Sequence, residues 1–339
     1  MTPLRIAVLG YGYWGPHIAR NISQIPLFSL VGIIDRSSDR LDLASKKHPD
    51  VPMFRSLQDA LESTKLDAIV IATPTHTHFQ LTLQVLEAGL HVLVEKPITT
   101  STKEALELSN LAKRQSRILM VDHTFLYTPA VSKLKEIVDS TSLGDLIYFD
   151  SMRVNLGIFQ PDVSVLWDLA VHDIAILLYV TGLSPISVNA IGGMHRDSKY
   201  EAAMFLTLQF QNLFFAHINV SWLSPMKIRR TVLSGSQKTV LFDDMSNDEK
   251  IRIYDASVDY FSVEDLLRYR LGGLHIPRLD GSEALSNELR HFHDCIIGGI
   301  EPHSSGHSAV EIIAILEAAQ KSAENQGRTV TISDQSFAA

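Results

Sequence analysis

The chain has 339 residues, of which 45% are hydrophobic and 20% are charged. This is the profile of a folded globular protein rather than a disordered one, and the length allows two domains with a substantial core. The formal net charge of −8 is spread along the sequence without a basic block, so no nucleic-acid partner is expected. No stretch of about 18 consecutive apolar residues occurs, and we therefore expect no membrane-spanning segment and no membrane partner.

Two further features predict a cytoplasmic location. The segment Met1–Arg5 leads directly into a short apolar strand, so no signal peptide is expected. Cys295, the single cysteine, cannot form an internal disulfide and lies in an apolar stretch. We expect it to be packed and reduced.

Residues 1–122 alternate short β-branched runs with amphipathic helical stretches, and Gly89 is placed to end one of these helices. The predicted strands are Arg5–Leu9, Phe28–Ile34, Ala68–Ile71, His91–Val94 and Ile118–Val121, and the predicted helices are Pro16–Ser23, Arg40–Lys47, Leu57–Glu62, Thr77–Ala88 and Thr102–Arg114. Several strands are apolar on both faces, as in a parallel sheet covered by helices on both sides. We predict an α/β fold for this part, a doubly wound Rossmann domain.

Residues 123–339 show a different pattern, in which apolar and polar residues interleave within most strands. The predicted strands are Asp145–Val154, Ile186–Ile191, Ala203–Phe210, Phe214–Trp222, Arg229–Leu233 and Thr239–Phe242, and the predicted helices are Thr128–Asp139, Trp167–Tyr179, Glu283–Ile297 and Ala309–Glu324. A short turn at Gln211-Asn212 favours antiparallel pairing. We predict a second, α+β domain with an open, mostly antiparallel sheet.

The stretch from Gly10 to Gly15 fits the pattern G-x-G-x-x-G, follows a predicted strand and opens a predicted helix. Asp35 lies twenty residues beyond Gly15, at the end of the second strand. This context predicts a dinucleotide site, the alternative being a glycine-rich turn without a ligand. A carboxylate at Asp35 suits an adenosine ribose and repels a 2′-phosphate, which favours NAD. Arg36 and Arg40 could hold a phosphate, so NADP remains possible.

Two motifs carry the residue types needed for chemistry. Glu95-Lys96-Pro97 follows a buried strand, where ligands bind to an open parallel sheet; the alternative is a surface lysine paired with Glu95. Asp168 and His172 lie four residues apart and would share one face of a helix. A histidine oriented by a carboxylate can transfer protons near neutral pH, whereas a structural Asp with a buried His is the alternative.

These motifs occur together with the turn Thr73–His78 and the run Ala88–Pro97. In this order they resemble the glucose–fructose oxidoreductase/inositol dehydrogenase family, often called Gfo/Idh/MocA, over essentially the whole chain. The resemblance implies that Lys96 lies near the nicotinamide and the reacting carbon, that Pro97 is a candidate cis residue, and that Asp168 and His172 transfer the proton. We therefore expect Lys96, His172 and Asp168 to be catalytic.

The glycine-rich turn and the resemblance together predict the cofactor contacts, with His76 lining the nicotinamide pocket. The set is Gly10, Gly12, Tyr13, Trp14, Gly15, Asp35, Arg36, Thr73, Pro74, His76, Glu95 and Lys96. His78 is expected to cap the following helix. No metal site is expected, because His76 with His78, and His291 with His293, lack a third ligand at a known spacing.

The expected substrate contacts are Lys96, Tyr127, Arg153, Asn155, Asp168 and His172. The stretch from Arg153 to Gly157, like Trp14, resembles the branch of the family that handles nucleotide-linked sugars. Arg153 suits a carboxylate or phosphate, or is an ordinary strand-surface arginine. Asn155 would bind sugar hydroxyls or satisfy a turn.

The expected function is hydride transfer between NAD(P) and a secondary hydroxyl or ketone of a sugar. The sugar is expected to be nucleotide-linked, of the UDP-N-acetylhexosamine type, and to react at C3. One alternative is a dehydrogenase of free sugars or cyclitols, and another is a non-catalytic redox sensor that binds the dinucleotide. The open sheet face predicts a homodimer or homotetramer.

Overall fold

The computed structural model describes residues 2–157, 163–195, 199–260 and 267–332. Within the chain, contacts define two compact units. Unit 1 holds the chain up to Tyr127 together with Ser282–Ile313, and unit 2 holds Thr128–Gly281 and the segment that begins at Ala314. The boundary at residues 122 and 123 that the sequence suggested thus differs from the structure, because the helix that begins at Ala284 packs on unit 1.

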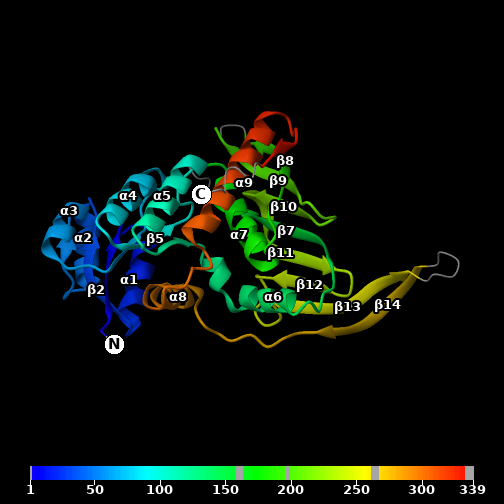
Figure 1. The fold of residues 1–339 in the computed structure, drawn as a ribbon, viewed down its shortest axis with the longest axis horizontal. Coiled ribbons are helices and arrows are strands. Elements are labelled where there is room, and N and C mark those ends of the chain that lie inside the picture. The colour runs from blue at the N-terminus through cyan, green and yellow to red at the C-terminus, as the bar shows by residue number, and fades with distance from the viewer. Residues whose placement is uncertain (1, 158–162, 196–198, 261–266, 333–339) are drawn as a thin grey trace. The chain divides into compact units, whose positions relative to one another are not determined.

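Unit 1, most of which is drawn in blue to cyan in Figure 1, contains a six-stranded parallel sheet in the order β3-β2-β1-β4-β5-β6. This is the doubly wound order expected for dinucleotide-binding domains. Its strands are β1 (Leu4–Leu9), β2 (Phe28–Ile34), β3 (Met53–Phe54), β4 (Ala68–Ile71), β5 (His91–Glu95) and β6 (Leu119–Asp122). Every residue of β4 and β6 is buried, in agreement with the continuous apolar runs of the sequence.

The helices of unit 1 begin and end close to the predicted positions. They are α1 (Gly15–Gln24), α2 (Ser38–Lys47), α3 (Leu57–Ser63), α4 (His78–Glu87), α5 (Thr102–Arg114) and α8 (Ala284–Gly298), with 3₁₀ turns η1 (Thr75–Thr77) and η2 (Thr124–Tyr127). Ser37, Ser56 and Ser101 accept N-cap hydrogen bonds at the starts of α2, α3 and α5. Gly89 takes φ +73° just after α4, which confirms the predicted cap.

Unit 2 contains a nine-stranded sheet in the order β14-β13-β12-β11-β7-β10-β9-β8-β15. Among the described strands, β7 and β10 pair in parallel and the other neighbours are antiparallel, which confirms the prediction of a mostly antiparallel sheet. The strands are β7 (Leu146–Leu156), β8 (Ser187–Met194), β9 (Glu201–Gln209), β10 (Phe215–Ser221), β11 (Leu223–Gly235), β12 (Thr239–Asp243), β13 (Ile251–Tyr260), β14 (Leu267–His275) and β15 (Val330–Thr331).

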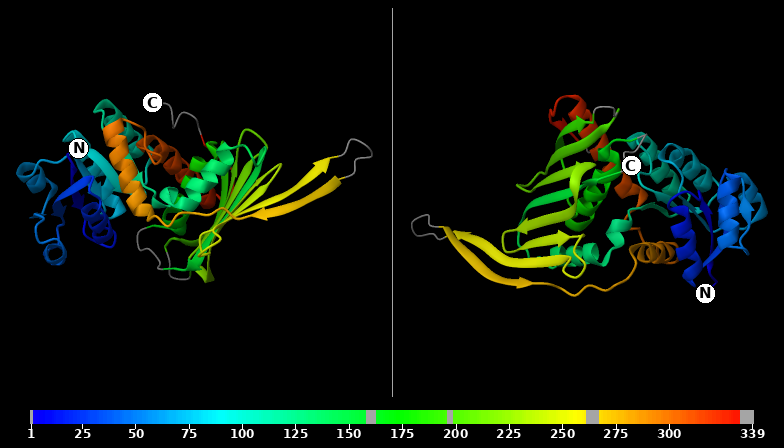
Figure 2. Two further views of the ribbon diagram at one scale, coloured as in Figure 1. Left: turned by 90° about the horizontal axis from the view of Figure 1, so that it is seen from below. Right: turned by 180° about the vertical axis from the view of Figure 1, so that it is seen from behind.

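Helices cover one face of this sheet and leave the other face open (Figure 2). They are α6 (Pro129–Asp139), a π-helical turn η3 (Leu166–Ala170) that runs directly into α7 (Val171–Thr181), and the last turns of α9 (Gly306–Glu324). Along β9, Met204 and Leu206 are buried, whereas Phe205 between them is 51% exposed. No helix in the described part of the chain is both long and apolar enough to cross a membrane.

The structure differs from the predicted elements of unit 2 in two places. Strands β13 and β14 were not predicted, and they form a long hairpin that continues the sheet at one edge (Figure 1). The predicted helix Trp167–Tyr179 is continuous but not α-helical throughout, because its first turn is the π turn η3. A π turn often occurs at a functional site.

A buried ion pair joins α7 to the middle of the sheet. Arg153 Nε on β7 donates to Asp173 Oδ2 at 2.7 Å, and Arg153 Nη2 donates to Oδ1 at 3.2 Å. Ser151 Oγ donates to the same Oδ1 at 2.7 Å. Since Arg153 and Asp173 are both buried, these contacts fix the first turn of α7 on β7.

Replacing Asp173 by alanine should destabilise the protein by about 3–5 kcal/mol, because the buried Arg153 would lose its bidentate carboxylate partner. Urea unfolding followed by circular dichroism measures the loss. The control is Asp139→Ala, which removes an exposed partner of Lys135 and should cost about 1 kcal/mol or less. Equal losses in the two variants would contradict the structural role given to Asp173.

Candidate functional site

The glycine-rich turn lies between β1 and α1, and two of its glycines have no room for a side chain. Gly10 adopts φ +100°, and a Cβ there would lie 2.3 Å from the carbonyl oxygen of Ala72. A Cβ at Gly15 would lie 2.2 Å from the carbonyl oxygen of Gly10. At Gly12, in contrast, a Cβ would meet the end of the Arg40 side chain at 3.7 Å. The turn therefore leaves space at Gly12 for a pyrophosphate beside the N-terminus of α1, as a dinucleotide requires.

Asp35 follows β2 and is held at the base of this turn. Its Oδ2 accepts a hydrogen bond from the Tyr11 amide at 2.7 Å, and its Oδ1 accepts one from the Ser37 amide at 2.9 Å. Arg40 Nη1 lies 3.5 Å from Oδ2, and Arg36 is exposed. The carboxylate is thus fixed at the strand end where a ribose would bind, with one arginine paired to it.

Tyr13 and Trp14 stand on the outer side of the turn. Tyr13 is 79% exposed and Trp14 is 46% exposed. Their rings meet edge to face with centroids 5.3 Å apart. Both side chains are thus exposed beside the turn, and their contact with a cofactor stays a prediction.

The turns that follow β4 and β5 bring the next predicted residues to the same edge of the sheet. Thr73 and Pro74 follow β4, and Lys96 follows β5, which is the neighbouring strand. The Lys96–Pro97 peptide bond is cis, which confirms that prediction. His76 lies in η1 and is exposed.

His78 does not cap α4, so the suggested capping role is wrong. Its side chain is 1% exposed and lies beneath the two turns. Nδ1 lies 2.8 Å from the carbonyl oxygen of Pro97, and Nε2 lies 2.7 Å from that of Thr73. Burial lowers the pKa of His78, while the two carbonyl contacts act in the opposite direction.

Three buried carboxyl groups gather beside the Lys96 turn, and we call them the carboxyl cluster: Glu95, Asp122 and Glu288. Glu95 ends β5 and faces Asp122 in register on β6. Glu288 reaches them from α8 and is fully buried. Burial is the main cause that raises the pKa of Glu95 and that of Glu288 well above the ordinary value, followed by the charge of Asp122. Glu95 and Glu288 therefore hold their protons more tightly than exposed carboxyl groups do.

Glu95 was expected to contact the cofactor. In the structure it is a buried residue whose carboxyl group lies among other buried acids. Asp122 and Glu288 were not predicted as functional residues. Asp122 could have been noticed because, like Glu95, it ends a buried strand. Glu288 carries no local signal. The neighbouring His123 is also buried, and burial followed by the charge of Lys96 lowers its pKa to about 3.

In unit 2, Asp168 lies in the π turn η3 and His172 lies in the first turn of α7; both are half-buried. Trp222 Nε1 donates to Asp168 Oδ2 at 3.1 Å. Trp222 follows β10 and is fully buried, so it fixes the position of the carboxylate. The π turn changes the angle between Asp168 and His172 from that of a regular α-helix, on which the prediction relied. No local pattern in the sequence singles out Trp222.

Two of the expected substrate contacts make structural contacts instead. Arg153 is 4% exposed and pairs with Asp173, so it is not the strand-surface arginine that the sequence left open. Tyr127 is 5% exposed, and its hydroxyl lies 2.9 Å from Ser304 Oγ. Burial, followed by the charge of Glu288, raises the pKa of Tyr127 well above its ordinary value. Asn155 is half-buried on β7.

Cys295 is free and buried, as expected from the sequence. Burial, and secondarily the charge of Asp294, raises the pKa of its thiol to about 11. Its Sγ lies 3.4 Å from His291 Nε2, while His293 pairs with Asp294. Within the described ranges, no group of three or more His, Cys, Asp or Glu side chains is placed to hold a metal ion.

Two family models match the chain. The model described as "Oxidoreductase family, NAD-binding Rossmann fold" matches residues 4–123, and the "GFO/IDH/MocA C-terminal domain" matches residues 131–241. Both matched segments lie where the structure has the parallel and the mixed sheet.

Individual relatives add to this match. UDP-N-acetylglucosamine 3-dehydrogenase from Acidithiobacillus ferrooxidans is 32% identical over 200 residues, which are 57% of this chain and 59% of that protein. The scyllo-inositol 2-dehydrogenase (NAD(+)) of Bacillus subtilis is 25% identical over 312 residues, or 88% of each chain. A solved structure of the A. ferrooxidans enzyme shares the fold, with a TM-score of 0.81, 24% identity and coverage of 96% of this chain and 99% of that chain.

The carboxyl cluster predicts a specific dependence of stability on pH. A carboxyl whose pKa is raised on folding contributes stability that is fully present below its unfolded value, near 4.5, and is lost as the pH rises through the folded value. Glu288→Gln keeps the shape of the side chain but cannot ionise. The variant should therefore lose less stability than the wild type between about pH 5 and pH 8, by about 1 kcal/mol or more.

Urea unfolding at a series of pH values measures this difference. Glu283→Gln is the matched control, because Glu283 is half exposed and pairs with Arg20 just before the same helix. This variant should leave the slope of the free energy of unfolding against pH unchanged between about pH 5 and pH 8. If the free energy of unfolding changed with pH in the same way in the wild type and in Glu288→Gln, the prediction that the cluster takes up protons on folding would be wrong.

Proposed function

Because the chain belongs to the Gfo/Idh/MocA family of oxidoreductases, we propose that it is an NAD-dependent dehydrogenase acting on a secondary hydroxyl or ketone of a sugar. The observation that carries this proposal is the edge of the parallel sheet, where a glycine turn suited to a dinucleotide and the cationic Lys96 both follow buried strands. We further propose a nucleotide-linked sugar of the UDP-N-acetylhexosamine type that reacts at C3. The identity with UDP-N-acetylglucosamine 3-dehydrogenase supports that substrate class.

The residues at this edge fit NAD. The backbone of the glycine turn would hold the pyrophosphate, Asp35 would accept hydrogen bonds from the ribose, and Tyr13 and Trp14 would cover the cofactor. The remaining proposed contacts are Arg36, Thr73, Pro74, His76 and Lys96. NAD supplies the hydride acceptor when bound. NADP is the second candidate, because Arg36 and Arg40 flank the ribose position.

His172 accepts the hydroxyl proton of the substrate during oxidation and returns it during reduction. Lys96 donates a hydrogen bond to the substrate oxygen and stabilises the negative charge that develops there. Asp168, held by Trp222, stabilises the protonated imidazole. Asn155 remains a proposed contact to sugar hydroxyls, whereas Arg153 and Tyr127 are not carried forward.

Absorbance of NADH in a substrate panel tests the proposal. The panel contains UDP-N-acetylhexosamines and their uronates, inositols, and free hexoses, each with NAD and with NADP. We expect the highest kcat/KM with a UDP-N-acetylhexosamine and NAD. Preference for an inositol would favour the cyclitol alternative, which the longer alignment with the B. subtilis enzyme supports. Bound NAD that no substrate reduces would favour a redox sensor.

Lys96→Met and His172→Asn should each lower kcat by about 100-fold to 10,000-fold, since each removes a group that acts in the transition state. Single-turnover rates of NADH formation measure the loss, and fluorescence titration should show that NAD still binds. His217→Asn is the control, because His217 pairs with Asp150 on the open sheet face. Near-normal turnover in both variants would contradict the assigned roles.

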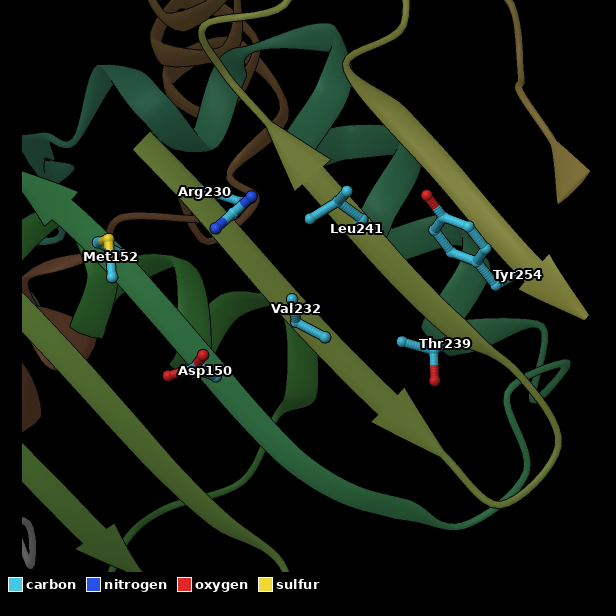
Figure 3. A pocket seen from close by; sticks show the side chains of 7 residues that line it. All are labelled: Asp150, Met152, Arg230, Val232, Thr239, Leu241 and Tyr254. Carbon is cyan, nitrogen blue, oxygen red and sulfur yellow. The ribbon is translucent and has the colours of Figure 1, made fainter. Parts of the chain in front are cut away.

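The open face of the unit 2 sheet supports a proposal of self-association. Ile191, Phe205 and Phe215 on this face are each more than 40% exposed. Beside them lies a shallow hollow of about 280 Å³ (Figure 3), lined by Asp150, Met152, Arg230, Val232, Thr239, Leu241 and Tyr254. A sheet face of this kind is usually covered by a partner. We propose that a second copy covers it, in a homodimer or homotetramer.

Phe205→Glu should weaken this association, because it would bury a charge between the two copies. Sedimentation equilibrium at micromolar concentration should show a dimer or tetramer for the wild type and a lower mass for the variant. Leu213→Glu, in the exposed turn between β9 and β10, should leave the mass unchanged. A monomeric wild type would contradict the proposal.

A further inference from the structure

His78 has no part in the reaction outlined above, although it lies directly beneath the turn that carries Lys96. We infer that His78 is a positioning residue, which fixes the Lys96 turn by tying it to the Thr73 turn. The inference rests on the role proposed for Lys96.

The imidazole connects two loops that the sheet itself does not connect. β4 and β5 pair in parallel as far as Ile71 and Val94, and β5 pairs with β6 for one residue more, to Glu95, before its chain leaves the sheet. His78 lies 2.7 Å from the carbonyl oxygen of Thr73 on one side and 2.8 Å from that of Pro97 on the other. With 1% exposure, the ring has no freedom to turn away from these loops.

The sequence of the two turns explains why a side chain is needed there. Each turn contains a proline, Pro74 in one and Pro97 in the other, and a proline has no N–H to donate. A buried carbonyl that loses its ladder partner requires another donor. His78 begins α4, just after the Thr73 turn, so its ring lies between both carbonyl oxygens; it donates to one of them as the neutral imidazole and to both only as the imidazolium.

The contact at Pro97 bears directly on Lys96. Pro97 is the residue next to Lys96, so a contact that holds the carbonyl of Pro97 also holds the backbone from which the Lys96 side chain extends. A shift of about 1 Å in a catalytic group can lower a rate about 100-fold. Loss of the His78 contact should therefore reduce kcat more than it weakens NAD binding.

Three variants test the inference. His78→Phe keeps an aromatic ring but removes both nitrogens, and His78→Gln restores an amide that can donate to a carbonyl. His91→Gln is the matched control: His91 is a half-buried histidine at the opposite end of β5, and its Nδ1 accepts the Ile118 amide at 2.9 Å. Each variant is measured for thermal midpoint, kcat, KM and NAD affinity.

We expect His78→Phe to lower kcat about 10-fold to 100-fold with little change in NAD affinity. His78→Gln should recover most of that loss, and His91→Gln should keep wild-type kcat even if its thermal midpoint falls. Wild-type kcat in His78→Phe would overturn the inference. So would equal losses in His78→Phe and His91→Gln, or a glutamine variant no better than the phenylalanine variant.

A second readout does not depend on the substrate. The rate at which pyridoxal 5′-phosphate and borohydride label Lys96, measured by peptide mass spectrometry, reports the surroundings of its amine. We expect a change of several-fold in His78→Phe and none in His91→Gln. An unchanged rate in His78→Phe would overturn the inference even if no sugar proved to be a substrate. A changed rate without any sugar turnover would contradict the proposed function alone.

Discussion

The parallel strands of unit 1 end at one edge of the sheet, where their backbone hydrogen bonding stops. The features proposed for function in that unit lie at this edge. Where β1, β2, β4, β5 and β6 stop, their backbone groups lose the partners that the sheet provides. Side chains replace some of these partners: Asp35 accepts the Tyr11 amide, and His78 reaches the carbonyl oxygens of Thr73 and Pro97. The same edge offers space at Gly12 and a cation at Lys96. The groups that complete the backbone hydrogen bonds at this edge thus lie beside the groups proposed to bind the ligand.

The two units place charge in the protein interior in different ways. In unit 2, Arg153 and Asp173 form a bidentate pair that compensates both charges. In unit 1, the carboxyl groups of the cluster lie beside one another, and burial raises the pKa of Glu95 and that of Glu288, while the charge of Lys96 opposes this rise at Glu95. The first arrangement makes the start of α7 rigid near His172. The second places acids with raised pKa values beside the Lys96 turn, where strained or costly groups often serve function.

Much of the fold could be predicted because local patterns determine it. The continuous apolar runs of Ala68–Ile71 and the G-x-G-x-x-G turn at Gly10 identify a doubly wound domain, and the structure has it. The hairpin of β13 and β14 was missed because its strands carry many charged residues, such as Arg252 and Arg270. Such strands are fixed by cross-strand pairing, which the periodicity of one segment does not reveal.

Short sequence motifs likewise identify some residues of the candidate site and miss others. Lys96, Asp168 and His172 could be selected because their motifs are short and continuous in the sequence. Glu288 reaches Asp122 from a helix far along the chain, and Trp222 reaches Asp168 from another strand end, so no local pattern identifies them. Arg153 was misread because its type suggests an anion, whereas its strand position buries it against Asp173.

Transfer of deuterium tests the central claim most directly. A UDP-N-acetylhexosamine carrying deuterium at C3 would be incubated with the enzyme and NAD, and the recovered cofactor examined by proton NMR. If the chain is the proposed dehydrogenase, one deuterium appears at C4 of the nicotinamide, and the sugar becomes a 3-ketone. Reduced cofactor without deuterium would contradict reaction at C3, and the absence of any reduced cofactor would contradict the proposed dehydrogenase activity on this substrate.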